Sequence, residues 1–299
     1  MVRSTTVPRR CHPPPCAPAI RAGFGLSDLA AAIIREPAAL VGLLMVASYA
    51  LVALTVGFLP LRDPLEISAQ RLAAPTGEHL LGTDALGRDL LSRILFGARL
   101  SMRVSLLSVA TAAFAGGALG LVSGYLGGWA DLAIGRVMDI FFAFPAILLA
   151  LGIVAALGPD PNNVIIAIAV VYTPILARVV RGPVLALKAR GFVEAARAVG
   201  ARPARIVLRH ILPNLLSTLI VQVSLALSWA VLTEGALSFL GLSAQPPAPS
   251  WGVMLNEGRQ YLEFATHLAL FPGLAIMIAV LGFNLLGDGL RDALDPQRR

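Results

Sequence analysis

Residues 38–59, AALVGLLMVASYALVALTVGFL, contain no charged side chain and follow directly after Pro37. An α-helix needs about 20 predominantly apolar residues to cross the hydrocarbon core of a bilayer. Five further runs reach or approach this length, at residues 104–127, 137–157, 164–180, 215–240 and 267–287. The sequence therefore predicts an all-α integral membrane protein with six transmembrane helices.

The composition agrees with a membrane location. Hydrophobic residues make up 57% of the 299 residues and charged residues only 14%, whereas a soluble domain carries about 25% charged residues. The net charge of +7 does not indicate nucleic-acid binding, because the basic residues lie in loops between apolar runs and do not alternate with aromatic residues. Basic cytoplasmic loops of a membrane protein account for the excess.

The distribution of Lys and Arg predicts the orientation in the membrane. Basic residues concentrate in the N-terminal tail, in the connection after the fourth span and in the C-terminal tail. With six spans these three segments share one side, so we expect both termini in the cytoplasm. One loop argues against this orientation, since residues 60–103 carry arginines on the opposite side: Arg62, Arg71, Arg88, Arg93, Arg99 and Arg103.

The chain divides into three parts. Residues 1–26 are Pro-rich and predict a disordered tail, in which Cys11, His12 and Cys16 are too few for a zinc site of about four ligands. Residues 27–103 are expected to hold a short amphipathic helix at 27–35 on the cytoplasmic face, the first span and an external loop. Residues 104–299 are expected to form the core, with five spans.

Two local patterns concern the second span. Gly116, Gly120, Gly124 and Gly128 recur at every fourth position, which favours close packing of one helical face against a neighbour. Packing within the subunit is the preferred interpretation and a seam between subunits is the alternative. Just before this span, Thr83 or Asp84 is expected to cap a helix that contains Leu90 and Leu91.

The connection between the fourth and fifth spans includes residues 191–214, GFVEAARAVGARPARIVLRHILPN. Residues 192–199 predict a helix that Gly200 can end, because glycine readily adopts positive φ. Pro203 suits the first turn of a second helix, and Pro213 is expected to break that helix before the fifth span. The product is a basic, partly apolar elbow able to fill a groove on a soluble partner. From the residues alone, an inert basic inside loop is an equal alternative.

Motifs for catalysis are missing from the sequence. It has no G-x-x-x-x-G-K-[ST] phosphate loop, no H-E-x-x-H and no G-x-S-x-G. The chain is therefore predicted to be no enzyme and to bind neither ATP nor a metal. Polar residues inside apolar runs are candidates for function, and these are Asp139, Glu234 and Asn284, with helix packing as the alternative. Arg136 or Arg178 is expected to neutralise Asp139.

The elbow also carries a family resemblance. Glu194-Ala195-Ala196, then Gly200, then Leu212-Pro213 resemble the EAA loop of type I ABC importer permeases. The string RHILPN at 209–214 has His210 where the general consensus is apolar, and it resembles the dipeptide and oligopeptide branch. The resemblance extends over about residues 27–296 through HLLGTDALGRDLLSR at 79–93, LSFLGLSAQPPAPSW at 237–251 and GDGLRDALDP at 287–296.

The resemblance implies a type I ABC importer (MetI-like) permease fold in the cell (inner) membrane and a translocation pathway for di- or oligopeptides. It implies a homologous permease, two ATPase subunits that bind ATP and Mg, and an extracytoplasmic solute-binding protein as partners. The implied ATPase-coupling residues are Glu194, Ala195, Ala196, Gly200, Arg209, His210, Leu212 and Pro213. Import of nickel, glutathione or another small solute is the alternative, and an ion-coupled secondary transporter fits less well because only one half of the chain has an elbow.

Overall fold

The structure is a computed structural model that describes residues 36–294. Over this range the regular secondary structure is entirely helical. The predicted tail at 1–26 and the predicted amphipathic helix at 27–35 lie outside the described residues.

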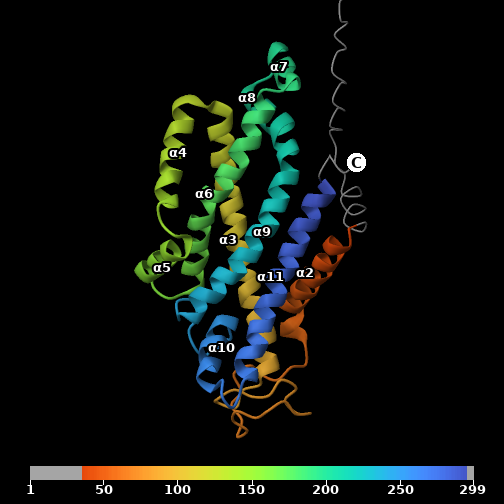
Figure 1. Ribbon diagram of the computed structural model, residues 1–299, viewed down its shortest axis with the longest axis vertical. Helices are drawn as coiled ribbons and strands as arrows, with labels where there is room; N and C mark the ends of the chain where they lie inside the picture. The colour runs from red at the N-terminus through yellow and green to blue at the C-terminus, as the bar shows by residue number, and fades with distance from the viewer. Residues whose placement is uncertain (1–35, 295–299) are drawn as a thin grey trace, which may run out of the picture.

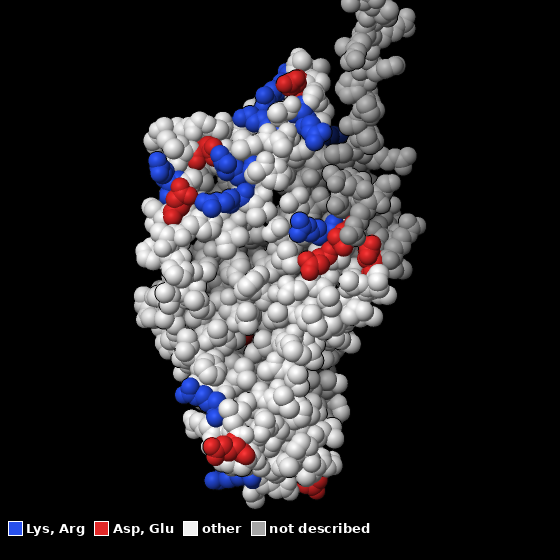
Figure 2. All heavy atoms as spheres, in the orientation of Figure 1, with Lys and Arg blue, Asp and Glu red and all other residues white. Residues whose placement is uncertain are grey.

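Five long helices run side by side along the molecule (Figure 1). They are α2 (Pro37–Thr55), α3 (Leu90–Leu126), α6 (Pro161–Lys188), α9 (Leu212–Phe239) and α11 (His267–Leu294). All five are long and apolar enough to cross a membrane. Lys, Arg, Asp and Glu gather toward the two ends of the visible face, and a broad belt between them is nearly free of charge (Figure 2). Such a belt suits contact with the hydrocarbon of a bilayer.

The third predicted span is not one helix. Residues 137–157 fall in two helices, α4 (Gly128–Phe142) and α5 (Ala146–Leu157), whose axes differ by 87°. Pro145 has no backbone N–H to donate, and the residue before a proline is disfavoured in the helical region. A proline within the run at 137–157 predicts a kink, and the break between α4 and α5 confirms it. The described residues hold five candidate spans, or six if this bent pair counts as one.

The helix α3 starts earlier than the second apolar run. It begins at Leu90, where the Asp89 side chain accepts a 2.8 Å hydrogen bond from the backbone N–H of Ser92. Asp89 is therefore the N-cap, and the expectation of Thr83 or Asp84 was wrong. The fourth span is longer than residues 164–180, because α6 continues through both Pro174 and Pro183.

The elbow joins α9 without the predicted break at Pro213. The helix α8 (Pro203–Ile206) leads into a π-helical turn, η2 (Val207–Ile211), and then into α9. At the end of this turn the N–H of Leu212 donates to the carbonyl of Val207, five residues back. This wider turn, which π-bulges provide within helices, accommodates Pro213 in the first turn of α9.

The glycines of α3 lie against α6. A Cβ placed on Gly116 would come 2.5 Å from the carbonyl oxygen of Thr173, and one on Gly120 would come 2.5 Å from that of Ala177. A Cβ on Gly124 would come 2.8 Å from the side chain of Val184. Gly128, by contrast, has open space around it and starts α4. Small residues let two backbones approach closely, so the preferred interpretation of packing within the subunit is confirmed for the first three glycines.

The short elements lie at opposite ends of the bundle. At one end stand α7 (Gly191–Ala198) and α8, which belong to the elbow (Figure 1). At the other end lie the loop after η1 (Val56–Phe58), the helix α10 (Trp251–Gly258) and η3 (Arg259–Tyr261). The Trp251 indole fixes α10 to α3 by donating a 2.8 Å hydrogen bond to the carbonyl of Ile94.

Candidate functional site

The elbow is anchored to the bundle by an apolar cluster. Val193 and Ala196 of α7 are buried together with Ile206, Ile211 and Leu215. This cluster also takes in Val180 and Val184 of α6, and Leu121 and Tyr125 at the end of α3 pack against it. The inner face of the elbow is therefore closely packed against the ends of α3, α6 and α9.

The turn at Gly200 ends α7 in a Schellman motif. The N–H of Ala201 donates to the carbonyl of Ala196 at 3.0 Å, and the N–H of Gly200 donates to that of Arg197 at 2.9 Å. Gly200 has φ +78°, a conformation that disfavours residues with a Cβ. The expected glycine C-cap is thus confirmed, and it fixes the angle between α7 and α8.

The outer surface of the elbow combines apolar and basic side chains. Val199 is 85% exposed, and Phe192 and Leu208 are exposed as well. Arg202, Arg205 and Arg209 are also exposed. Figure 2 shows the basic side chains gathered at this end of the molecule. A rigid helix pair with protruding apolar residues and a basic rim is suited to a groove on another protein.

The predicted coupling residues divide between the two sides of the elbow. Glu194, Ala195, Gly200, Arg209 and Pro213 are exposed, whereas Ala196 is buried and His210 and Leu212 are half-buried. The His210 ring lies 6.5 Å from the ring of Phe192, centroid to centroid. The carbonyl of His210 accepts a 2.6 Å hydrogen bond from the Asn214 side chain.

Asp139 on α4 has a partner on α6. Arg178 Nη2 donates to Asp139 Oδ1 at 3.0 Å, and both side chains are 59% exposed. The Arg178 guanidinium also lies 4.0 Å from the centroid of the Phe142 ring, a cation–π geometry. The expected neutralisation of Asp139 is confirmed, with Arg178 rather than Arg136 as the partner.

A second ion pair between α4 and α6 was not predicted. Asp131 accepts two 2.6 Å hydrogen bonds from Arg181, from Nε and Nη2, and a short one from Ser123. Both ion pairs border a cavity of about 260 Å³ between α3, α4 and α6. The sequence signal was weak, because residue 181 follows the fourth predicted span and residue 131 precedes the third.

Glu234 and Asn284 lie elsewhere. Glu234 on α9 is fully buried and accepts a 2.7 Å hydrogen bond from Ser101 of α3 and a 3.5 Å bond from Ser243. Asn284 is half-buried on α11. The cavity that Asp139 lines includes neither of them, so the structure does not bring the three polar candidates together.

Comparison with known proteins gives a family. Residues 116–299 match the family described as binding-protein-dependent transport system inner membrane component. A dipeptide transport system permease protein of Alkalihalophilus pseudofirmus is 48% identical over 266 residues, covering 89% of this chain and 88% of the relative. A glutathione transport system permease protein of Pectobacterium atrosepticum is 50% identical over 223 residues, covering 75% of this chain and 74% of the relative.

A solved structure has the same fold. A chain of the MetNI methionine ABC transporter, in an inward-facing conformation, superposes with a TM-score of 0.56 over 69% of this chain and 98% of its own length. Its sequence identity is 21%, so the similarity concerns the fold alone.

Proposed function

The chain belongs to the family of binding-protein-dependent transport system inner membrane components and is a permease of an ABC importer, and we propose that its pathway carries di- or oligopeptides. Relatives of similar identity are described as dipeptide and glutathione permeases. Glutathione is itself a tripeptide, so the two descriptions share peptide chemistry. Import of glutathione or of another small solute by the same architecture is the alternative.

The elbow at 191–214 is the proposed contact with the ATPase. This proposal rests on two features of the elbow. Phe192, Val199 and Leu208 are exposed on its outer face, and its inner face packs against α6 and α9. The sequence has no phosphate loop of its own, so energy from ATP must enter through a contact with another chain. A rigid elbow transmits the movement of that chain into the bundle.

The proposed assembly pairs this permease with a homologous permease in the lipid bilayer. Two ATPase subunits, which bind ATP and Mg, grip the two elbows, and an extracytoplasmic solute-binding protein delivers the cargo. The elbow end then faces the cytoplasm together with both termini. In support of this orientation, α2 begins and α11 ends toward the end of the bundle that carries α7 (Figure 1).

A charge reversal in the elbow tests the proposal. Glu194 is exposed in the first turn of α7, and Glu263 is an exposed acid at the other end of the bundle. We expect Glu194→Lys to reduce both co-purification of the ATPase and solute uptake at least tenfold, while Glu263→Lys leaves co-purification unchanged. Equal co-purification and uptake in both variants would exclude the elbow as the ATPase contact.

Competition assays test the substrate. In a strain that lacks the native gene, uptake of a labelled dipeptide is measured against excess unlabelled dipeptides, oligopeptides, glutathione and nickel. The proposal expects di- or oligopeptides to compete best. Competition by glutathione or by nickel alone would replace peptides with that solute.

A further inference from the structure

The end of the bundle opposite the elbow contains a cavity of about 170 Å³ that is lined by both charged and apolar side chains. Its walls come from the loop before α3 and the start of α3, from the α10–η3 segment and from the start of α11. Arg88, Arg93, Asp84 and Glu257 supply charged groups to it, and Leu86 and Met254 supply apolar surface. The pairing of charge with apolar surface is typical of sites for small polar solutes.

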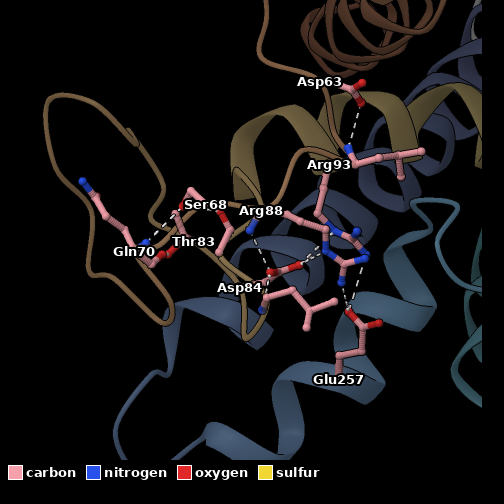
Figure 3. A network of polar contacts seen from close by, with 11 residues as sticks. Asp63, Ser68, Gln70, Thr83, Asp84, Arg88, Arg93 and Glu257 are labelled. Atoms are coloured by element: carbon pink, nitrogen blue, oxygen red, sulfur yellow. Dashed lines mark hydrogen bonds and ion pairs between the residues drawn. The ribbon is translucent and has the colours of Figure 1, made fainter.

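Two buried guanidinium groups dominate the cavity. Arg88 is 5% exposed and Arg93 is 1% exposed. Arg88 Nε donates to Asp84 Oδ2 at 2.6 Å, and Arg88 Nη2 lies 3.5 Å from Glu257 Oε2. In Figure 3 the two guanidinium groups lie between the carboxylates of Asp84 and Glu257.

Arg93 is poorly satisfied in this arrangement. Its Nη2 lies 3.5 Å from Glu257 Oε2, the atom that Arg88 also approaches, and its Nε lies 3.5 Å from Asp84 Oδ2. In the part of the chain that the structure describes, Arg93 Nε and Nη1 have no hydrogen-bond partner. A buried guanidinium with unmet donors is costly, so the site favours an additional acceptor.

The nearby acid Asp89 is not available for this purpose. Its Oδ1 lies 2.9 Å from His79 Nδ1, and its Oδ2 accepts from the N–H of Ser92 at the start of α3. Glu257, by contrast, keeps 38% of its side chain exposed. Arg88 and Arg93 therefore line the cavity with only long, 3.5 Å contacts to a single oxygen of Glu257, and Glu257 keeps part of its side chain open to a cationic group.

We propose that this cavity binds a small zwitterionic solute, with its carboxylate on Arg93 and Arg88 and its ammonium group on Glu257. A guanidinium presents its donors in a planar fork that matches a carboxylate. A peptide with free termini carries both required charges, and the apolar wall at Leu86 and Met254 contacts its body. The choice of peptides rests on the proposed function, and it places this site on the side from which solute arrives.

Binding to the purified complex tests the site directly. The complex of the permeases with the ATPases, prepared without the solute-binding protein, is dialysed to equilibrium against labelled dialanine, dialanine amide or N-acetyl-dialanine. We expect the amide, which lacks the carboxylate, to bind at least tenfold more weakly than dialanine. Equal binding of dialanine and its amide would overturn the proposal.

Substitutions at Glu257 and Arg93 distinguish a solute-binding role of this cluster from a purely structural one. Glu257→Gln removes the anion that competes for Arg93, so N-acetyl-dialanine, which has only the carboxylate, is expected to bind several-fold more tightly than to the native complex. A gain of binding cannot come from misfolding. Arg93→Gln is expected to abolish carboxylate-dependent binding, and the matched exposed acid Glu263, changed to Gln, is expected to have no effect. No gain in Glu257→Gln relative to Glu263→Gln would overturn the proposal.

The same assay is independent of transport. Carboxylate-dependent binding that responds to Glu257→Gln, in a complex that imports no peptide, would support the site and contradict the proposed substrate. Peptide import together with amide binding equal to that of dialanine would contradict the site and leave the proposed function standing.

Discussion

Ser101 Oγ donates a 2.7 Å hydrogen bond to Glu234 Oε2, and this bond joins α3 to α9 in the interior of the bundle. Glu234 has no exposed surface. Its second oxygen is 3.5 Å from the hydroxyl of Ser243, in the loop that follows α9. A buried carboxyl group is costly unless it is hydrogen-bonded, so the bond from Ser101 and the longer contact with Ser243 offset part of the cost of burying Glu234.

Removal of the Ser101 hydroxyl is therefore expected to destabilise the protein. In Ser101→Ala the carboxyl group loses its shorter hydrogen bond, which should lower the free energy of unfolding by about 1–3 kcal/mol. Thermal unfolding of the detergent-solubilised protein measures the change. Ser105→Ala is the matched control, because its buried hydroxyl donates only to the carbonyl of Ser101 within the same helix. An equal loss of unfolding free energy in Ser101→Ala and Ser105→Ala would show that the bond to Glu234 contributes no more than the bond within the helix.

Gly200 is expected to be sensitive to substitution because of its backbone and not because of crowding. It has φ +78° and open space around its Cα, so Gly200→Ala should cost about 1–2 kcal/mol through the left-handed conformation alone. The change should loosen the α7–α8 turn and lower uptake and ATPase co-purification together. Gly200→Asn should lose less, since Asn adopts this conformation more readily.

The control for this prediction lies at the other end of α7. Gly191 also has open space but no positive φ, so Gly191→Ala should leave uptake and co-purification unchanged. If Gly191→Ala and Gly200→Ala behaved alike, the Schellman turn would not set the geometry of the elbow.

At the contact between α3 and α6, alanine substitutions of two neighbouring glycines are expected to affect stability differently. A Cβ on Gly116 would come within 2.5 Å of the Thr173 carbonyl oxygen, whereas one on Gly117 would meet nothing within 4 Å. Because backbone atoms cannot move aside locally, Gly116→Ala should cost about 1–3 kcal/mol, and Gly117→Ala should be neutral or slightly stabilising. Thermal unfolding of the two variants in parallel checks this, and a larger loss in Gly117→Ala would refute it.

The ion pair between Asp131 and Arg181 is expected to hold α4 against α6. Asp131→Asn removes the charge from a contact that has two hydrogen bonds of 2.6 Å, and amide hydrogen exchange in α4 should become faster. Asp139→Asn should have a smaller effect, because its pair with Arg178 is more exposed and has one hydrogen bond. Exchange in α4 that is unchanged by Asp131→Asn would mean that packing alone holds this helix.

Apolar length and glycine chemistry were sufficient to predict much of this molecule. The run at 38–59 coincides, to within a residue, with a helix long and apolar enough to cross a membrane, and the run at 267–287 lies within another. Gly200 ends α7 as its freedom at positive φ suggested. Both features depend on local properties, which are the length of an apolar run and the conformation of a single residue. The elbow was accessible from the sequence for the same reason.

Other features depend on contacts between distant residues. The run 137–157 is as apolar as a straight span, and hydropathy does not register the 87° bend between α4 and α5. Asp131 and Arg181 are 50 residues apart in sequence. A helical period relates only residues three or four positions apart, so it cannot predict this pair. Arg88 and Arg93 counted against the predicted orientation as loop charges, yet both are buried and paired with acids.

The length of α3 has a mechanical consequence. Its 37 residues correspond to about 55 Å at 1.5 Å per residue, well beyond the hydrocarbon thickness of about 30 Å. Arg93 lies in its first turn, and Tyr125 near its last residue packs against the elbow cluster. A single uninterrupted helix thus has one end beside the cavity and the other beside the elbow. A rigid-body tilt of α3 about its glycine contacts with α6 would therefore move the cavity end and the elbow end in opposite directions.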